Sequence, residues 1–163
     1  MQLTHDSHHS YTHSKEIIIL CDRIHSPANQ GAIFRLADAF EVKEIVFIGA
    51  PIDIQSARLK KTARSTQQHI VYTHYECATT QLKHLQEQGY QCLALEITET
   101  SVPISQLQIT QNKIVLILGN EQEGVSQGIL QQVDKVMHIP MYGQNSSMNV
   151  AQAAAIALYH ISG

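Results

Sequence analysis

The sequence predicts an α/β protein whose mainly parallel sheet is covered by helices on both faces. Short runs of branched apolar residues recur along the chain, as in "EIIILC" (16–21) and "KIVLILG" (113–119). These runs are continuously apolar rather than alternating, which is typical of strands buried on both faces. Segments with helical periodicity separate them, and strands that alternate with helices favour parallel pairing.

Six strands and five helices are predicted. The strands are 16–21, 44–49, 68–73, 90–97, 113–119 and 135–140, and the helices are 29–40, 55–63, 76–88, 126–132 and about 147–161. Ligands of parallel sheets bind beyond the carboxyl ends of the strands. We therefore expect the chemistry in the segments that follow Cys21, Gly119 and Pro140.

Length and composition suit one globular domain. The chain has 163 residues, of which 44% are hydrophobic and 15% charged. We expect residues 15–163 to form a single domain and the polar, histidine-rich residues 1–14 to be a disordered tail. The alternative for this tail is an arm that binds metal or substrate.

Charge, cysteines and glycine motifs exclude several classes of protein. The net charge of −3 excludes a globally basic nucleic-acid binder, so a nucleic-acid site must be a local patch. The three cysteines show no C-x-x-C spacing, which disfavours disulfide and zinc frameworks and indicates the cytoplasm. No apolar run approaches the roughly 20 residues of a membrane helix. A P-loop and a G-x-G-x-x-G turn are also absent, which disfavours a nucleotide-dependent oxidoreductase.

The first candidate site segment is "SPANQGAIFRLADAF" (26–40). Asn29 is an N-cap candidate for the helix. Arg35 lies outside the apolar stripe and is expected to project over Gly31 towards the mouth of the sheet, where a guanidinium suits a phosphate or carboxylate. The alternative is a surface pair with Asp38. The stripe that faces the core is Ile33, Leu36, Ala37 and Phe40.

The second segment, "VLILGNEQEGVS" (115–126), follows a central strand. Glu121 and Glu123 bracket Gln122 just before Gly124. Their carboxyl groups suit acid/base chemistry, metal ligation or the stabilisation of a helix N-terminus. For Glu123 we favour turn formation and capping, whereas the role of Glu121 stays open.

The third segment, "IPMYGQNSSMNVAQAAAI" (139–156), joins a strand to the last helix through a run of polar residues. Capping by Ser147 explains only one of these polar side chains. The following helix carries an apolar face of mostly small residues, which suits close packing against another element. This face consists of Val150, Ala153, Ala154, Ala157 and Leu158.

These three segments together resemble the SpoU/TrmH branch of the SPOUT RNA methyltransferases. The first family motif matches Asn29, Gly31 and Arg35, and the second matches Leu118, Gly119, Glu121 and Gly124. The third, Ile-Pro-Met-x-Gly followed by Ser-Leu-Asn-Val, matches 139–143 and 147–150, with Met148 in the Leu position. Glu41 departs from the pattern, because a Gly commonly follows the first helix in the family.

The resemblance implies a C-terminal trefoil knot and S-adenosylmethionine as cofactor, without a metal. Its implied cofactor-binding residues are Leu95, Glu96, Leu118, Gly119, Ile139, Met141, Ser147, Met148 and Asn149. The implied catalytic residues are Asn29, Arg35, Glu121, Ser147 and Asn149. Since no further RNA-binding domain is visible, we expect a minimal catalytic domain.

The implied reaction is methyl transfer to a ribose 2′-hydroxyl of RNA, with tRNA favoured over rRNA. Arg35 is expected to bind an RNA phosphate and to serve the cofactor site of the other subunit of a homodimer. A basic cluster on the second helix is expected to contact phosphates, although a solvated helix face is the simpler interpretation of such a run. It comprises Arg58, Lys60, Lys61 and Arg64. The alternative function is a catalytically idle RNA-binding or assembly module with the same fold.

Overall fold

The computed structural model describes residues 1–163 and contains one seven-stranded sheet in which every pairing is parallel. The strands, in chain order, are β1 (Glu16–Asp22), β2 (Glu44–Ile48), β3 (Tyr72–Tyr75), β4 (Gln91–Leu95), β5 (Val102–Pro103), β6 (Lys113–Leu118) and β7 (Lys135–His138). Their spatial order is β3-β2-β1-β6-β4-β7-β5. The chain therefore builds outward from β1 on one side and fills the other side later.

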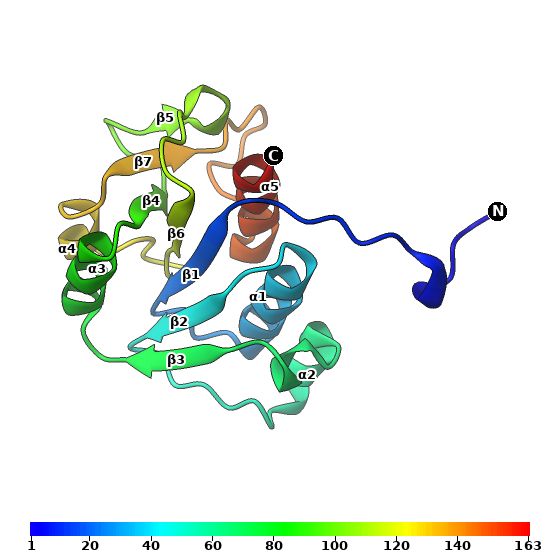
Figure 1. The fold of residues 1–163 in the computed structure, drawn as a ribbon. Coiled ribbons are helices and arrows are strands. Elements are labelled where there is room, and N and C mark those ends of the chain that lie inside the picture. The colour runs from blue at the N-terminus through cyan, green and yellow to red at the C-terminus, as the bar shows by residue number, and fades with distance from the viewer.

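Helices cover both faces of the sheet, which confirms the predicted fold class (Figure 1). The helices are α1 (Pro27–Ala39), α2 (Ala57–Ala63), α3 (Ala78–Glu87), α4 (Gln127–Leu130) and α5 (Val150–Ser162). α1, α2 and α5 contribute to a core cluster of 23 residues on one face, and α3 and α4 contribute to a second cluster of 13 residues on the other. Alternate residues of β1 enter the two clusters: Ile17 and Ile19 face one, and Ile18 and Leu20 face the other.

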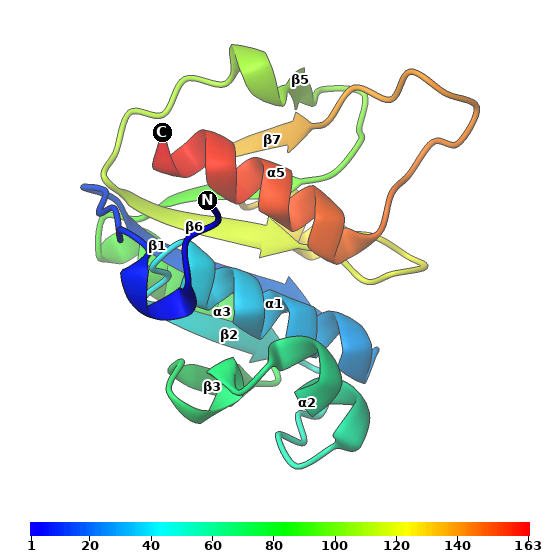
Figure 2. The ribbon, with the colours of Figure 1, turned by 90° about the vertical axis from the view of Figure 1, so that its right-hand side faces the viewer.

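The strands all point to the same side, where the loops after them lie (Figure 2). The short elements η1 (His5–Ser7), η2 (Thr66–Gln68) and η3 (Ile104–Gln106) complete the chain. Most residues of 1–14 are exposed, although the half-buried His13 places its Nε2 atom 2.6 Å from the carbonyl oxygen of Phe40. No helix is both long and apolar enough to cross a bilayer.

Two features of the predicted secondary structure are wrong. The strand expected at 68–73 begins only at Tyr72, because Thr66 and Gln67 form a buried 3₁₀ turn after α2. The two-residue strand β5 at the sheet edge was not predicted, since it is too short to show a pattern. The remaining strands lie within two residues of the predicted bounds.

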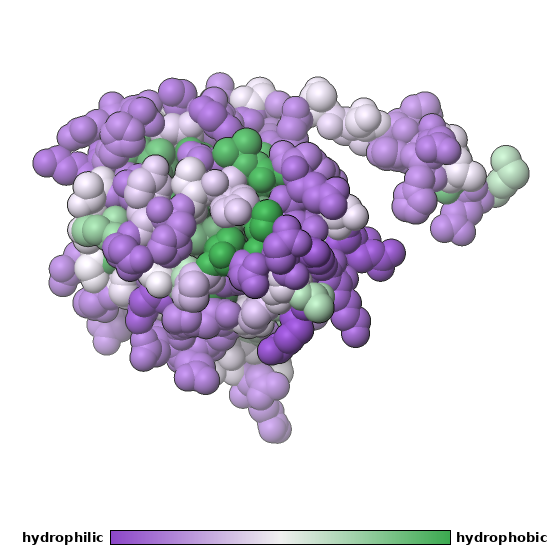
Figure 3. All heavy atoms as spheres, turned by 90° about the horizontal axis from the view of Figure 1, so that it is seen from below, coloured by the Kyte–Doolittle hydropathy of each residue, from purple (hydrophilic) through white to green (hydrophobic).

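Edge strand β3 lies on the side of the molecule shown in Figure 3, where hydrophobic residues gather in one area of a largely hydrophilic face. Val71, directly before β3, is 59% exposed.

Glu41 adopts a left-handed conformation with φ of 53° between α1 and β2. This explains why the family pattern has a glycine there, because a side chain in that conformation is strained.

Gly31 permits the close contact of α1 with α2. A Cβ atom at this position would lie 2.1 Å from Oγ1 of Thr62 and 2.2 Å from the carbonyl oxygen of Leu59. Oγ1 of Thr62 donates a hydrogen bond to the carbonyl oxygen of Ala28 at 2.8 Å, which fixes the two helices together. The space over Gly31 is therefore filled by α2, and the expectation that Arg35 projects through this space is wrong.

We expect Gly31→Ala to lower the free energy of unfolding by about 1–3 kcal/mol, because the added methyl overpacks the contact between α1 and α2. Urea denaturation measures this loss. The matched control is Gly128→Ala in α4, where the nearest atom to the added Cβ lies 3.8 Å away. Gly128→Ala should keep or raise stability, and wild-type stability of Gly31→Ala would contradict the tight contact.

Candidate functional site

Strand register brings the predicted site segments together. Cys21 of β1 pairs with Leu118 of β6, Leu118 pairs with Leu95 of β4, and Leu95 pairs with Met137 of β7. These four residues form one row across the sheet. Each strand ends within one residue of this row, so the segments that follow all leave the sheet at the same level.

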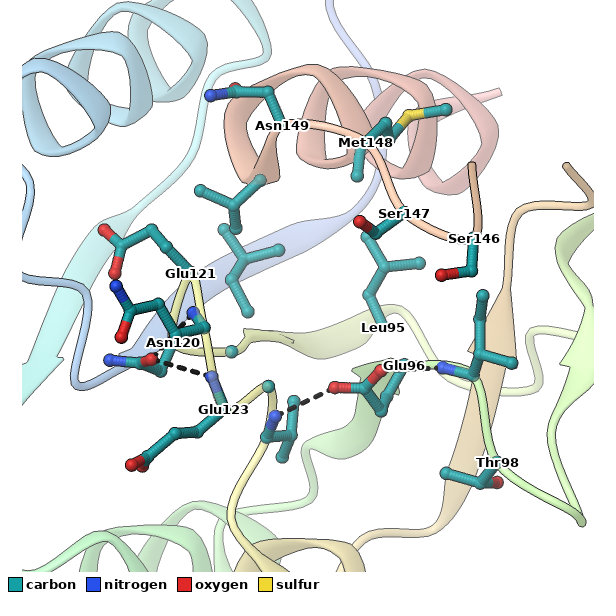
Figure 4. Close-up of a pocket in the computed structure, with 18 of the residues that line it drawn as sticks. Leu95, Glu96, Thr98, Asn120, Glu121, Glu123, Ser146, Ser147, Met148 and Asn149 are labelled. Carbon is teal, nitrogen blue, oxygen red and sulfur yellow. Dashed lines mark hydrogen bonds between the residues drawn. The ribbon is translucent and has the colours of Figure 1, made fainter. Parts of the chain in front are cut away.

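A large cavity of about 940 Å³ lies beyond this row, and a smaller one of about 130 Å³ adjoins it. The large cavity is lined by seven of the nine predicted cofactor residues and by Asn29 and Glu121. The other two predicted cofactor residues, Ile139 and Met141, line the smaller cavity. Figure 4 shows that the lining comes from the ends of β4 and β6 and from the loop before α5. Sequence reasoning therefore selected residues that the fold brings together.

Asn29 connects the three predicted segments through hydrogen bonds at the rim of the large cavity. Its Nδ2 atom donates to Oε1 of Glu121 at 3.4 Å, and its Oδ1 atom accepts from Nδ2 of Asn149 at 3.0 Å. Oδ1 of Asn149 in turn accepts from the backbone N–H groups of Ala151 and Gln152, at 2.9 and 3.2 Å. Asn149 is therefore the N-cap of α5 and also lines the large cavity.

The Glu121 carboxylate is held as an anion by the loop between β1 and α1. Ser26 N–H donates to Oε1 at 3.1 Å, and His25 N–H donates to Oε2 at 3.4 Å. Partial burial raises the pKa of Glu121, but hydrogen bonds from its own backbone, from Ser26, from Asn29 and from His25 lower it, and the net pKa lies below the ordinary value. A carboxylate held in this way is a poor proton acceptor and a good anchor.

The loop between β6 and α4 is fastened by residues that sequence reasoning missed. The buried Asp22 accepts from the N–H of Ser126 at 2.8 Å, and Arg23 forms an ion pair of 2.6 Å with Glu123. Oδ1 of Asn120 accepts from the N–H groups two and three residues on, each at 2.9 Å, and its Nδ2 donates to the carbonyl oxygen of Arg23 at 2.6 Å. Asn at the start of a glycine-containing turn was the available signal for Asn120.

Several predicted roles are wrong or have no supporting hydrogen bond. Ser26, not Asn29, caps α1, because its side chain accepts from the N–H of Asn29 at 3.2 Å. Glu123 lies in a turn, as predicted, but its carboxylate pairs with Arg23 and does not cap a helix. Ser147 lines both cavities, but its hydroxyl has no hydrogen-bond partner within the chain.

Arg35 is exposed on α1 and lines neither cavity of its own chain. The alternative pairing with Asp38 is also wrong, since Asp38 instead lies 2.7 Å from Nε2 of His69. Arg58, Lys60, Lys61 and Arg64 are likewise exposed, and none forms an ion pair. No cluster of His, Cys, Asp or Glu has the arrangement of a metal site.

A model of the SpoU rRNA Methylase family matches residues 16–159. The chain belongs to this family. It is 28% identical over 146 residues to a 23S rRNA (guanosine(2553)-2′-O)-methyltransferase of Bacillus subtilis, an alignment that covers 90% of this chain and 58% of that relative. It is 31% identical over 144 residues to the tRNA (guanosine(18)-2′-O)-methyltransferase of Escherichia coli, with 88% and 62% covered.

The fold of this chain is similar to that of solved methyltransferase structures. An AdoMet-bound rRNA methyltransferase from Sinorhizobium meliloti superimposes with a TM-score of 0.81 at 26% identity, over 90% of this chain and 55% of that one. The present chain thus spans about 60% of the length of the curated relatives it matches, 58% and 62% for the two named above.

Asn149 allows its two structural roles to be separated. Asn149→Ala removes the cap of α5 and should lower the free energy of unfolding by about 0.5–2 kcal/mol. Asn149→Asp keeps the capping oxygen but has no N–H to give to Asn29, so its stability should stay near that of the wild type. Urea denaturation measures both.

Both Asn149 variants should weaken the binding of S-adenosylmethionine, the cofactor that the family resemblance implies, by about 1–3 kcal/mol, because neither variant can form the bond that orders the loop. Calorimetric titration measures the affinity. Equal stability of Asn149→Ala and the wild type would contradict the capping role, and unchanged cofactor affinity of Asn149→Asp would contradict the site role.

Proposed function

We propose that the protein transfers a methyl group from S-adenosylmethionine to a ribose 2′-hydroxyl of RNA. The observation that carries this proposal is the position of Asn29, which is hydrogen-bonded to both Glu121 and Asn149 at the rim of the cavity. The three family motifs thereby meet in one network. The curated relatives named above, one directed at rRNA and one at tRNA, support the same reaction class.

The residues around the two cavities fit the cofactor. Apolar side chains, among them Leu95, Leu118 and Met148, suit an aromatic base. The carboxylates Glu96, Glu121 and Glu123 line the large cavity without a Lys or Arg, which suits a ligand that carries a sulfonium and an ammonium charge. When bound, the cofactor supplies a methyl group on a cationic sulfur, which makes the thioether a good leaving group.

The residues of the chain position the acceptor hydroxyl. In the reaction the ribose oxygen forms a bond to the methyl carbon, the carbon–sulfur bond breaks, and the hydroxyl proton passes to a base. Glu121 is held by three N–H groups, so we assign it the task of fixing Asn29 and the loop of Asn149. The guanidinium is permanently charged and its fork of N–H donors matches a phosphate, so we assign Arg35 to the phosphate next to the target ribose, where it holds the hydroxyl in line.

Methyl transfer in vitro tests the function. Protein, labelled S-adenosylmethionine and total tRNA or rRNA should give a labelled ribose-methylated nucleotide, which nuclease digestion and mass spectrometry identify. We expect tRNA to be the better acceptor. Cofactor binding without transfer to either RNA would favour the alternative, an idle module of the same fold. Absence of cofactor binding would overturn the proposal.

The basic cluster on α2 is proposed as a phosphate-binding surface. Arg58, Lys60, Lys61 and Arg64 are exposed, and α2 is packed on α1, which carries Arg35. The nearest polar contact, Nζ of Lys60 with Oε1 of Gln55 at 2.9 Å, leaves the four charges without an acidic partner. Such a group can replace condensed counterions along an RNA backbone.

Neutralising all four residues to Gln should weaken RNA binding and flatten its salt dependence. The log–log slope should fall by about 0.7 for each single-stranded phosphate that the variant no longer neutralises. Filter binding over a range of salt concentrations measures this. Lys83→Gln removes one exposed positive charge on α3, which covers the opposite face of the sheet, and as a control it should leave the slope near that of the wild type. An unchanged slope in the fourfold variant would mean that the cluster is only a solvated helix face and does not bind RNA.

A homodimer with composite sites is the proposed working unit. The small-residue face predicted on α5 is not available to a partner, because Ala154, Ala157 and Leu158 are fully buried in their own chain. The outward face instead exposes Ile156 and Tyr159, at 42% and 77%. Since neither of the two cavities of the site is lined by a Lys or Arg, Arg35 of the same chain included, a second copy that supplies Arg35 would complete the site.

Subunit mixing tests the composite site. Arg35→Ala should lose methyl transfer and keep cofactor binding, whereas Asn149→Ala should lose cofactor affinity. In a mixed dimer, one site combines the intact Arg35 of one chain with the intact loop of the other. Random exchange makes half the dimers mixed, so activity should recover to roughly a quarter of wild type. Verified exchange without recovery would mean that each chain builds its own site.

The remaining expectations extend this proposal. We propose that residues 15–163 form the catalytic unit and that its C-terminal segment is threaded through a trefoil knot. The likeness to SpoU structures supports the knot, whereas the strand order and register alone do not depend on threading. Three free cysteines suit work in the reducing cytoplasm.

A further inference from the structure

Glu96 lies where the two cavities meet. It lines both of them and follows directly after β4. The smaller cavity is lined mainly by apolar side chains, whereas the larger carries most of the polar groups. The apolar residues of the smaller cavity are Leu95, Ile97, Ile139, Met141, Met148 and Ala153. Glu96 is the one acidic residue at this junction.

The Glu96 carboxylate is held in a fixed position. Its Oε2 atom accepts from the N–H of Val125 at 2.9 Å, and its Oε1 atom accepts from the N–H of Ile97 at 2.9 Å (Figure 4). A Cβ atom at Gly124 would lie 2.2 Å from Oε2, so the carboxylate fits against a backbone that has no side chain. It therefore joins the end of β4 to the loop between β6 and α4.

The carboxylate retains hydrogen-bonding capacity. Each oxygen can accept about two hydrogen bonds, and the chain supplies one to each. Glu96 takes part in no ion pair, and no Lys or Arg lines either cavity. A half-buried carboxylate without a cation is stabilised by further O–H or N–H donors. On the side that faces the cavity, the chain supplies none, so a bound ligand can provide them.

The position of Glu96 indicates which group of a ligand donates hydrogen bonds to its carboxylate. An aromatic base in the apolar cavity would place its attached sugar at the junction, where the Glu96 carboxylate lies. A ribose offers two adjacent hydroxyl donors, and acidic residues bind ribose hydroxyls in dinucleotide sites. We propose that Glu96 accepts hydrogen bonds from the ribose hydroxyls of S-adenosylmethionine. This inference rests on the proposed cofactor and gives Glu96 a role that Asn29, Glu121 and Asn149 do not fill.

Binding of S-adenosylhomocysteine and its 2′-deoxy and 3′-deoxy analogues tests this role by calorimetry, independently of catalysis. The wild type should bind at least one deoxy analogue about 10- to 100-fold more weakly, because that analogue cannot donate to the charged acceptor. In Glu96→Ala this discrimination should shrink to roughly twofold or less. Glu96→Gln, which keeps one acceptor oxygen, should discriminate to an intermediate degree.

Two controls separate ribose binding from loop anchoring. Removal of the anchor would weaken all three ligands together, whereas only a direct contact changes their ratio. Glu99→Ala, three residues along the same segment and exposed, should discriminate as the wild type does. An analogue that lacks the α-amino group should bind more weakly by the same factor in the wild type and in Glu96→Ala.

The outcomes are distinct. Equal binding of the three ligands by the wild type would overturn the ribose contact, even if Glu96→Ala failed to fold. Loss of discrimination against the amino-deficient analogue in Glu96→Ala would assign the carboxylate to the ammonium group and likewise overturn it. If the wild type bound no S-adenosylhomocysteine, the cofactor assignment itself would fall, and this role with it.

Discussion

The register of four parallel strands is the constraint on which the site depends. Because Cys21, Leu118, Leu95 and Met137 lie in one row, four segments distant in sequence leave the sheet at one level. The strand order changes direction at the neighbouring pair β1 and β6, and the helices that follow them, α1 and α4, cover opposite faces of the sheet. A shift of one strand by one residue would turn its core side chains to the other face, so hydrophobic burial also fixes the site.

The fold could be predicted in large part from the sequence because its strands are buried on both faces and read as continuous apolar runs. For the candidate site, the sequence predicted most of the residues that line the two cavities, because the family motifs name positions that strand register then gathers. The motifs did not predict which way each side chain points. Arg35 lies on the exposed side of α1 because α2 fills the space over Gly31, a contact that depends on two helices and on no local pattern. The contacts by which Asp22 and Arg23 hold the loop between β6 and α4 are equally non-local.

Charge divides the molecule into two regions that complement each other. Carboxylates line the cavity, whereas the unpaired cations of α1 and α2 lie outside it. A ligand with positive charge is suited to the first region, and a phosphate backbone to the second. RNA that reached the cavity of a single chain would meet acidic groups first, which is the physical reason to look for a second chain at the site.

The network that joins Asn149, Asn29 and Glu121 has a direction, because its two ends are chemically unlike. At one end, the first turn of α5 offers only N–H donors, so the amide of Asn149 must present its oxygen to the helix and its nitrogen to Asn29. At the other end, a carboxylate can only accept, so Asn29 must present its nitrogen to Glu121. Neither amide can turn over without breaking bonds at both of its ends. The polarity of the two side chains is thus dictated by a helix terminus and an anion, before any ligand arrives.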